Sequence, residues 1–188
     1  MKKVDLLFLD TEFTGLHQQT SLISLALVPM DGPYFYAEFT DYKVQQIDDW
    51  LQQNVLANLY LDSVENELVK TNEYWQIKGD TISIQKYLEA YLTLFDNIKI
   101  WADCPAYDWV LFCNLFGGAL KIPNNIHYMP MDFATALYVR GYKPDEDRLK
   151  WLEKPSRIQF KKHNALGDAM VLKECYLKLN KLNETKRD

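Results

Sequence analysis

The chain has 188 residues, of which 48% are hydrophobic and 14% aromatic, so it can bury one well-filled core and is too apolar for an intrinsically disordered protein. Its formal net charge of -5 argues against nucleic-acid binding through a uniformly basic surface, but it allows a local basic strip or phosphate binding through metal ions. The N-terminus lacks the architecture of a signal peptide, and no apolar run approaches the length of a membrane span. Three cysteines without CxxC spacing, Cys104, Cys113 and Cys175, are expected to be free, buried thiols in a reducing compartment. We therefore expect a soluble, cytoplasmic protein with no membrane partner.

The first predicted element is a strand that ends in two carboxylates. Residues 6–9 form an unbroken apolar run, the pattern of a strand covered on both faces. Asp10 and Glu12 follow it directly, and residues two apart on an extended chain point to the same face. Neighbouring carboxylates repel one another, and a divalent cation with oxygen ligands would remove that repulsion. On these two residues alone, a strand end with solvated acids is the favoured interpretation.

The remaining elements predict a mixed sheet flanked by helices. Hydrophobic periodicity and turn signals predict, in chain order, strands at 22–28 and 34–39, a helix within 46–60, a helix at 81–95 capped by Asp80, a strand at 98–101, a helix around 110–116, a strand near 127–131, a short helix at 132–138 and a last helix at 165–179. The first three strands form an antiparallel meander, and the polar stretch 61–78 is ambiguous. This order indicates one α/β domain over residues 1–180, followed by a polar tail at 181–188.

One segment is basic within an acidic chain. Residues 140–162 contain eight basic and four acidic side chains, and residues 154–162 contain four basic side chains and no acidic one. A loop of this kind could meet a phosphate backbone. Most charge runs are solvated surface loops, so the charge alone does not decide between the two interpretations.

The next stretch adds a histidine and a third acid. His163 and Asp168 lie five residues apart, whereas a zinc pair on one helix face needs three or four. If Asn164 caps the last helix, Asp168 falls in its first turns and His163 lies just outside, on a loop that is free to move. Beside other acids, such a histidine is placed to act as a general base.

A fourth acid comes from one of two nearby positions. Asp108 lies at the expected start of the helix around 110–116, where its charge suits the helix dipole with or without a function. Asp103 precedes Cys104 and Pro105, and an acid at such a turn is more often bound to local backbone amides.

The acids and the histidine, taken in chain order, match the motifs of a known protein family. The run from Asp10 to Leu16 (Asp-Thr-Glu-Phe-Thr-Gly-Leu), then Asp108, then His163 with Asp168, resembles the DEDDh-type 3′→5′ exonucleases of the ribonuclease H-like superfamily. The motifs span residues 10–168, and the chain is most similar to small stand-alone bacterial exoribonucleases, and also to oligoribonuclease and ribonuclease T. Asp103 departs from the family pattern, because many members have Asn five residues before the second-motif acid. The spacing favours Asp108 over Asp103 as the fourth ligand, and the sequence leaves a contribution from Asp103 open.

The resemblance implies a fold and a chemistry. The fold is a ribonuclease H-like mixed sheet of five strands, a three-stranded antiparallel meander plus parallel strands, flanked by helices. The implied activity is metal-dependent 3′→5′ hydrolysis of single-stranded or short RNA by a two-metal mechanism. Two Mg²⁺ or Mn²⁺ ions would be held by Asp10, Glu12, Asp108 and Asp168. His163 would take the proton from the attacking water, and a homodimer is also implied.

Substrate contacts and rival functions complete the expectations. The residues expected to bind substrate are Phe13, Thr14, Gly15, Leu16, Lys161 and Lys162. For Leu16, filling the edge of the core is nearly as good an interpretation. A 3′→5′ DNA exonuclease of the proofreading type shares every motif and is the closest alternative function. A catalytically inactive nucleic-acid-binding module is a further alternative, against which the intact set of four acids and a histidine argues.

Overall fold

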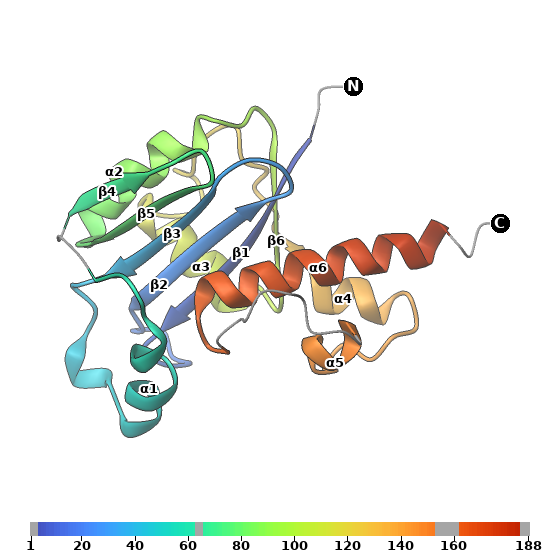
Figure 1. Ribbon diagram of the computed structural model, residues 1–188, viewed down its shortest axis with the longest axis horizontal. Helices are drawn as coiled ribbons and strands as arrows, with labels where there is room; N and C mark the ends of the chain where they lie inside the picture. The colour runs from blue at the N-terminus through green and yellow to red at the C-terminus, as the bar shows by residue number, and fades with distance from the viewer. Residues whose placement is uncertain (1–3, 63–65, 153–161, 185–188) are drawn as a thin grey trace.

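The computed structural model describes residues 4–62, 66–152 and 162–184 (Figure 1). Its strands are β1 (Asp5–Phe13), β2 (Leu22–Pro29), β3 (Tyr34–Phe39), β4 (Glu67–Lys70), β5 (Tyr74–Gly79), β6 (Ile98–Ala102) and β7 (Met131–Asp132). Its helices are α1 (Asp49–Asn54), α2 (Thr81–Leu92), α3 (Ala106–Leu115), α4 (Phe133–Tyr138), α5 (Arg148–Leu152) and α6 (Ala165–Glu184), with short 3-10 helices η1 (Val44–Gln46) and η2 (Leu56–Asn58).

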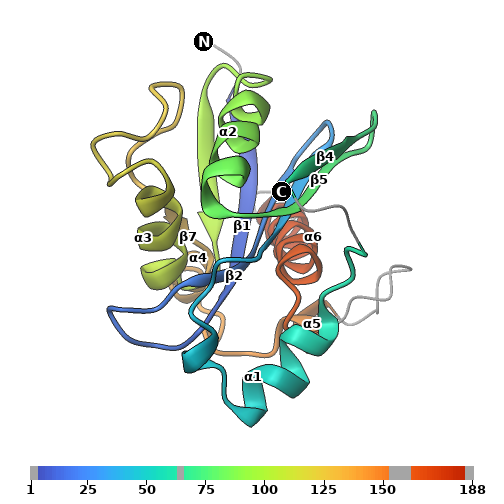
Figure 2. The same ribbon diagram turned by 90° about the vertical axis from the view of Figure 1, so that its left-hand side faces the viewer.

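The strands form one mixed sheet in the order β4-β5-β3-β2-β1-β6-β7. β1, β2 and β3 pair antiparallel, which confirms the predicted meander, and β6 pairs parallel with β1. β7 pairs parallel with β6 over only two residues, later in the chain than expected. Figure 2 shows α2 and α3 on one side of the sheet and α6 on the other. The fold is therefore the α/β, ribonuclease H-like arrangement that was expected.

The described sheet has two strands more than the five predicted. β4 and β5 pair antiparallel within the polar stretch that the sequence left ambiguous, and β5 pairs parallel with β3. β5 alternates between buried and partly exposed residues, but β4 at the sheet edge is mostly exposed. Because an edge strand buries little apolar surface, its hydrophobic pattern is too weak to predict a strand.

The two faces of β1 separate the core from the acids. Leu7 and Leu9 pack in the core cluster that contains residues of α2 and α3, whereas Phe8 packs in the cluster that contains residues of α6. Asp10 and Glu12 share the parity of Phe8, so their side chains belong to the face that α6 covers. β2 is buried along its whole length, which holds β1 rigidly between two neighbours.

The predicted helix caps are confirmed. Asp80 accepts a hydrogen bond from the Ser83 amide at 2.7 Å, and Asp132 accepts one from the Ala134 amide at 3.0 Å. α6 extends to Glu184, five residues beyond the predicted end. The three cysteines are free thiols, as expected, and Cys113 and Cys175 are buried, but the expectation of a buried thiol is wrong for Cys104, which is exposed. Within the described ranges, no helix combines the length and apolarity that a membrane span requires.

Candidate active site

Two elements bring three of the predicted residues together. Glu12 lies near the end of β1, where the register with β2 shifts between Glu12 and Phe13. Asp168 lies in the first turn of α6, and its Oδ2 accepts a hydrogen bond from the His163 amide at 3.1 Å. One ligand atom from each of Glu12, His163 and Asp168 lies within 4.8 Å of the other two. Asp10 and Asp168 also line a common cavity of about 410 Å³.

Asp108 reaches the site from the other side of the sheet. It lies in the first turn of α3 and is 9% exposed. The backbone amide and the hydroxyl of Thr11 both donate to its Oδ1, at 2.9 Å and 2.7 Å. Thr11 points away from Asp10 because of strand alternation, so it can bind α3 while Asp10 faces α6. Thr11 was not among the predicted site residues, because its only signal in the sequence is its position between two acids.

The four acids repel one another. Burial, followed by the charges of the other acids, raises the pKa of Asp10 well above its usual range. The same causes, burial first, raise the pKa of Glu12 to about 8. Burial also raises the pKa values of Asp108 and Asp168, each to about 6. Across residues 4–62, 66–152 and 162–184, no lysine or arginine forms an ion pair with any of the four. A set of hard oxygen donors with this excess of negative charge suits a divalent cation.

His163 is the cluster's only histidine. Its backbone φ is 58°, and its ring makes an edge contact with the ring of Trp50 in α1, with centroids 5.1 Å apart. Burial, and then the charge of Lys162, lower its pKa, so the imidazole is neutral near pH 7 and can accept a proton. His163 lies outside the helix, as predicted, and it contacts α1 and the first turn of α6. The freedom of this loop to move stays a prediction.

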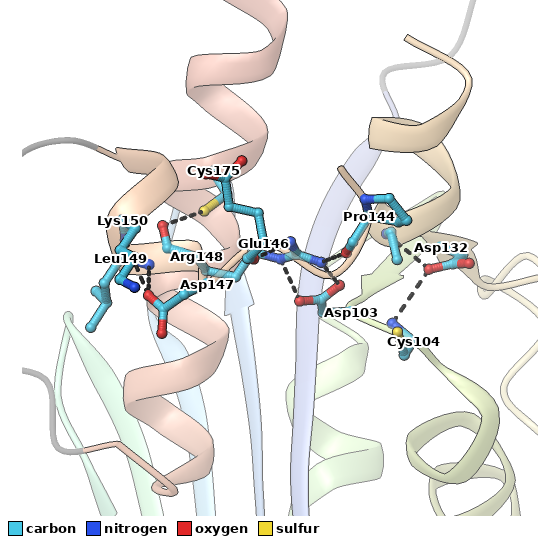
Figure 3. Close-up of polar contacts among 11 residues, drawn as sticks. Asp103, Cys104, Asp132, Pro144, Glu146, Asp147, Arg148, Leu149, Lys150 and Cys175 are labelled. Atoms are coloured by element: carbon cyan, nitrogen blue, oxygen red, sulfur yellow. Dashed lines mark hydrogen bonds and ion pairs between the residues drawn. The ribbon is translucent and has the colours of Figure 1, made fainter. Parts of the chain in front are cut away.

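Asp103 is bound by a distant arginine. Its two carboxylate oxygens accept hydrogen bonds from Arg148 Nε at 2.6 Å and Nη2 at 2.7 Å (Figure 3). The Arg148 guanidinium also donates to the Pro144 and Glu146 carbonyls, which fixes the loop before α5 against the end of β6. The prediction that Asp103 is held by local amides is therefore wrong. A bidentate arginine pair of this kind orients the carboxylate and neutralises its charge.

The predicted substrate residues divide into two groups. Leu16 is 78% exposed, which excludes the interpretation that it fills the core edge. Gly15 has φ of 152°, and a Cβ there would lie 3.0 Å from the His17 ring, so this position favours glycine. Phe13 stacks on Tyr107, with centroids 5.3 Å apart.

The other three predicted substrate residues are Thr14, Lys161 and Lys162. The Thr14 hydroxyl is used within the protein, because it accepts from the Ser21 amide at 2.9 Å and donates to Gln46 Oε1 at 2.5 Å. Lys162 is exposed, and its Nζ lies 3.6 Å from Asp147 Oδ2. Lys161 lies outside the described residues. The substrate-binding roles of all these residues stay predictions.

The mixed sheet with acids at the end of its central strand defines a ribonuclease H-like α/β protein with an acidic site. The chain belongs to the 3'-5' exoribonuclease Rv2179c-like domain family, whose sequence model matches residues 5–179. This membership confirms the resemblance to stand-alone bacterial exoribonucleases.

Two proteins of Mycobacterium tuberculosis are similar to this chain. They are 3'-5' exoribonuclease MT2234.1 from strain CDC 1551 / Oshkosh and 3'-5' exoribonuclease Rv2179c from strain ATCC 25618 / H37Rv. Each is 31% identical over 121 residues, which cover 63% of this chain and 66% of the relative.

Proposed function

We propose that this protein is a metal-dependent 3′→5′ exoribonuclease of the DEDDh type that acts on single-stranded or short RNA. The observation that carries the proposal is the convergence of four carboxylates from β1, α3 and α6 with no described arginine or lysine paired to them. Such a cluster destabilises the protein unless cations bind there, so a role in chemistry is the best account of it. The printed names of the two mycobacterial relatives support the same activity.

The residues divide the work between metal binding and proton transfer. Asp10, Glu12, Asp108 and Asp168 would hold two Mg²⁺ or Mn²⁺ ions. When bound, the ions neutralise phosphate charge and stabilise the leaving 3′ oxygen. His163 accepts the proton of the attacking water, which its depressed pKa permits near neutral pH. Thr11 holds Asp108 in place through two hydrogen bonds to one oxygen.

Substrate binding involves the loop after β1 and the basic segment. Leu16 is exposed and follows Glu12 closely in the chain, so it can contact the terminal nucleotide. Phe13, the last residue of β1, can do the same. Gly15 lets the backbone approach the nucleotide closely. Lys161 and Lys162 attract the phosphates electrostatically, an interaction that does not depend on the nucleotide sequence.

The test uses 5′-labelled single-stranded RNA and DNA oligomers, with Mg²⁺ or Mn²⁺ and with a chelator. We expect stepwise shortening from the 3′ end, faster for RNA, and no reaction with chelator. Asp10→Asn, purified identically, controls for contaminating nucleases. Cleavage at internal positions, or activity in chelator, would overturn the mechanism. DNA loss that equals or exceeds RNA loss would favour the proofreading-type alternative, and no cleavage with retained binding would favour an inactive module.

A homodimer is proposed from the resemblance alone. Sedimentation at micromolar concentration tests it directly, and a monomer there would remove the dimer without affecting the catalytic proposal.

A further inference from the structure

One residue of η2 holds both neighbours of His163. The Asn58 side-chain amide donates to the Lys162 carbonyl at 2.8 Å. The Asn58 carbonyl in turn accepts a hydrogen bond from the Asn164 side-chain amide at 3.0 Å. His163 lies between Lys162 and Asn164 in the chain, so the residue on each side of it is hydrogen-bonded to Asn58, one through its carbonyl and the other through its side chain.

The segment that carries Asn58 is anchored on a buried acid of β3. Glu38 is fully buried, and its Oε1 accepts from the amides of Tyr60 at 2.8 Å and Leu61 at 3.1 Å. Lys78 Nζ lies 3.5 Å from Glu38 Oε2, which offsets the buried charge. Oε1 accepts both amide hydrogen bonds, whereas Oε2 is buried without a hydrogen-bond partner and has only the Lys78 charge nearby. Losing the bonds to Oε1 would leave further buried polar atoms unpaired, so this oxygen holds the chain that binds it. Glu38 therefore connects Tyr60 and Leu61, which follow Asn58 closely in the chain, to the sheet.

A second route runs from the same acid to Asn164. The Tyr36 hydroxyl donates to Glu38 Oε1 at 3.0 Å and accepts from the Asn164 side-chain amide at 3.2 Å. Asn164 is 4% exposed, and its Oδ1 accepts from the Gly167 amide at 3.2 Å as the cap of α6. The Tyr36 and Tyr60 rings also stack, with centroids 4.9 Å apart and planes 3° apart.

The backbone of His163 needs this support. Its φ of 58° lies in the left-handed region, which a residue with a side chain occupies at a cost and keeps only when its surroundings determine it. Three sets of contacts hold His163 in this conformation. They are the hydrogen bonds of Asn58 to its two neighbours, the hydrogen bond from the His163 amide to Asp168, and the ring contact with Trp50.

We infer that Asn58, anchored through Glu38 and Tyr36, is a positioning residue that holds the His163 imidazole where it accepts the proton. The inference rests on the proposed function, because it assigns Asn58 a role through the general base. A general base that is already in position before substrate binds avoids the entropic cost of ordering it during each turnover. Misplacement of a catalytic group by about 1 Å can lower the rate about 100-fold. Asn58 is not one of the proposed metal ligands or substrate-binding residues, and it bonds to both chain neighbours of His163, so its assigned role runs through His163.

The first test is a double-mutant cycle on RNA hydrolysis. We expect Asn58→Ala to lower kcat about tenfold and to leave KM within about twofold, as outer-shell residues do. His163→Ala alone lowers kcat by about 100-fold or more. In the His163→Ala background, Asn58→Ala has no further effect, because the group through which it acts is gone.

A matched control separates positioning from general stability. Asn125 lies before β7, and its side-chain amide donates to two backbone carbonyls, those of Leu92 at 2.9 Å and Phe95 at 2.8 Å. Asn125→Ala therefore removes comparable hydrogen bonds from a loop that is not in contact with His163, and it should leave kcat unchanged. Tyr36→Phe removes only the hydroxyl between Asn164 and Glu38, and we expect a smaller kcat loss in the same direction. It also keeps the inference testable if Asn58→Ala does not fold.

A second readout does not depend on activity. The protein has three histidines, so the His163 ring resonance can be assigned by its absence in His163→Ala. In the metal-free wild type we expect one sharp His163 signal, which broadens or shifts in Asn58→Ala and stays unchanged in Asn125→Ala.

The outcomes distinguish the two proposals. Equal kcat losses from Asn58→Ala with and without His163, or an unchanged His163 signal, would overturn the positioning role. A His163→Ala variant with full activity would instead overturn the general base in the proposed function, while the resonance experiment would still report whether Asn58 orders the ring.

Discussion

At the scale of single residues, two acids five positions apart have different partners. Asp108 is buried and bound by Thr11, whereas Asp103 is paired with Arg148. Because the charge of Asp103 is already matched by a guanidinium, Asp103 is the weaker candidate for a metal ligand, and Asp108 keeps the role that its spacing predicts.

Asp108→Asn is expected to abolish RNA hydrolysis and leave the protein folded. The amide oxygen can still accept from Thr11, but the charge that a metal requires is lost. Asp103→Asn should retain substantial activity and lose about 1 kcal/mol of stability from the weakened Arg148 pair. Metal-dependent turnover and thermal unfolding of both variants measure this. An inactive, folded Asp103→Asn beside an active Asp108→Asn would reverse the assignment, and equal losses would indicate five acids in the site.

Leu16→Ala tests the exposed end of the first motif. Leu16 is 78% exposed and supports no core packing, so its removal should leave the melting temperature unchanged. If Leu16 packs against the terminal nucleotide, KM should rise about threefold to tenfold, since losing a buried apolar contact costs about 1 kcal/mol. Leu120→Ala, at another fully exposed leucine, is the matched control. An unchanged KM would show that Leu16 does not contact substrate.

At the scale of elements, the basic segment around α5 is partly engaged in structure. Arg148 binds Asp103, and the Arg140 guanidinium donates to the Ala136 carbonyl at 2.9 Å. Lys162 keeps a largely exposed side chain although it lies 3.6 Å from Asp147. The basic charge available to a phosphate backbone is therefore smaller than the count of basic residues suggests.

Replacement of Lys161 and Lys162 with Gln should weaken RNA binding more than it slows turnover of bound RNA. Two lost phosphate contacts on a single strand would make the slope of log affinity against log salt shallower by about 1.4. The Lys162 carbonyl, which Asn58 binds, is unaffected by this change. The control removes two lysines elsewhere, Lys86→Gln with Lys121→Gln. An unchanged salt slope would identify the segment as a solvated loop.

At the scale of the whole molecule, the acid cluster lowers the stability of the metal-free protein. The pKa of Glu12 is raised from 4.5 to about 8, so between these values the folded state binds more protons than the unfolded state. The free energy of unfolding therefore falls as pH rises through this window.

Glu12→Gln should remove this dependence. We expect similar melting temperatures for the wild type and Glu12→Gln near about pH 5, and a more stable variant near about pH 8, both in chelator. Comparison of the two proteins cancels the titration of groups outside the acid cluster. A difference in melting temperature that does not change with pH would show that Glu12 is not destabilised by its surroundings.

Mn²⁺ should raise the melting temperature of the wild type at neutral pH, because a ligand that binds only the folded state stabilises it by mass action. Asp10→Asn should show little of this shift. It removes the carboxylate that the charges of the other acids in the site act on, and therefore a main ligand for the cation. Asp31→Asn, which removes a carboxylate from the exposed turn between β2 and β3, is the control. Equal shifts in the two variants would place the bound ion elsewhere.

The sequence by itself determined the features that depend on local pattern. The apolar run before Asp10, the alternation that sets Asp10 and Glu12 on one face, and the capping residues Asp80 and Asp132 each act within a few residues. The fold class followed from the order of these elements, and the family motifs supplied the candidate site.

Only the tertiary structure decided the partners that hold the site. Thr11 meets Asp108, Asp103 meets Arg148, and Asn58 meets both neighbours of His163, in each case across many intervening residues. β4 and β5 likewise become strands through pairing with each other and with β3. A hydrogen bond between distant residues produces no periodic pattern and no local propensity in the sequence. In the sequence alone, each partner is indistinguishable from an ordinary polar residue. Its existence depends on the packed sheet that brings the two together.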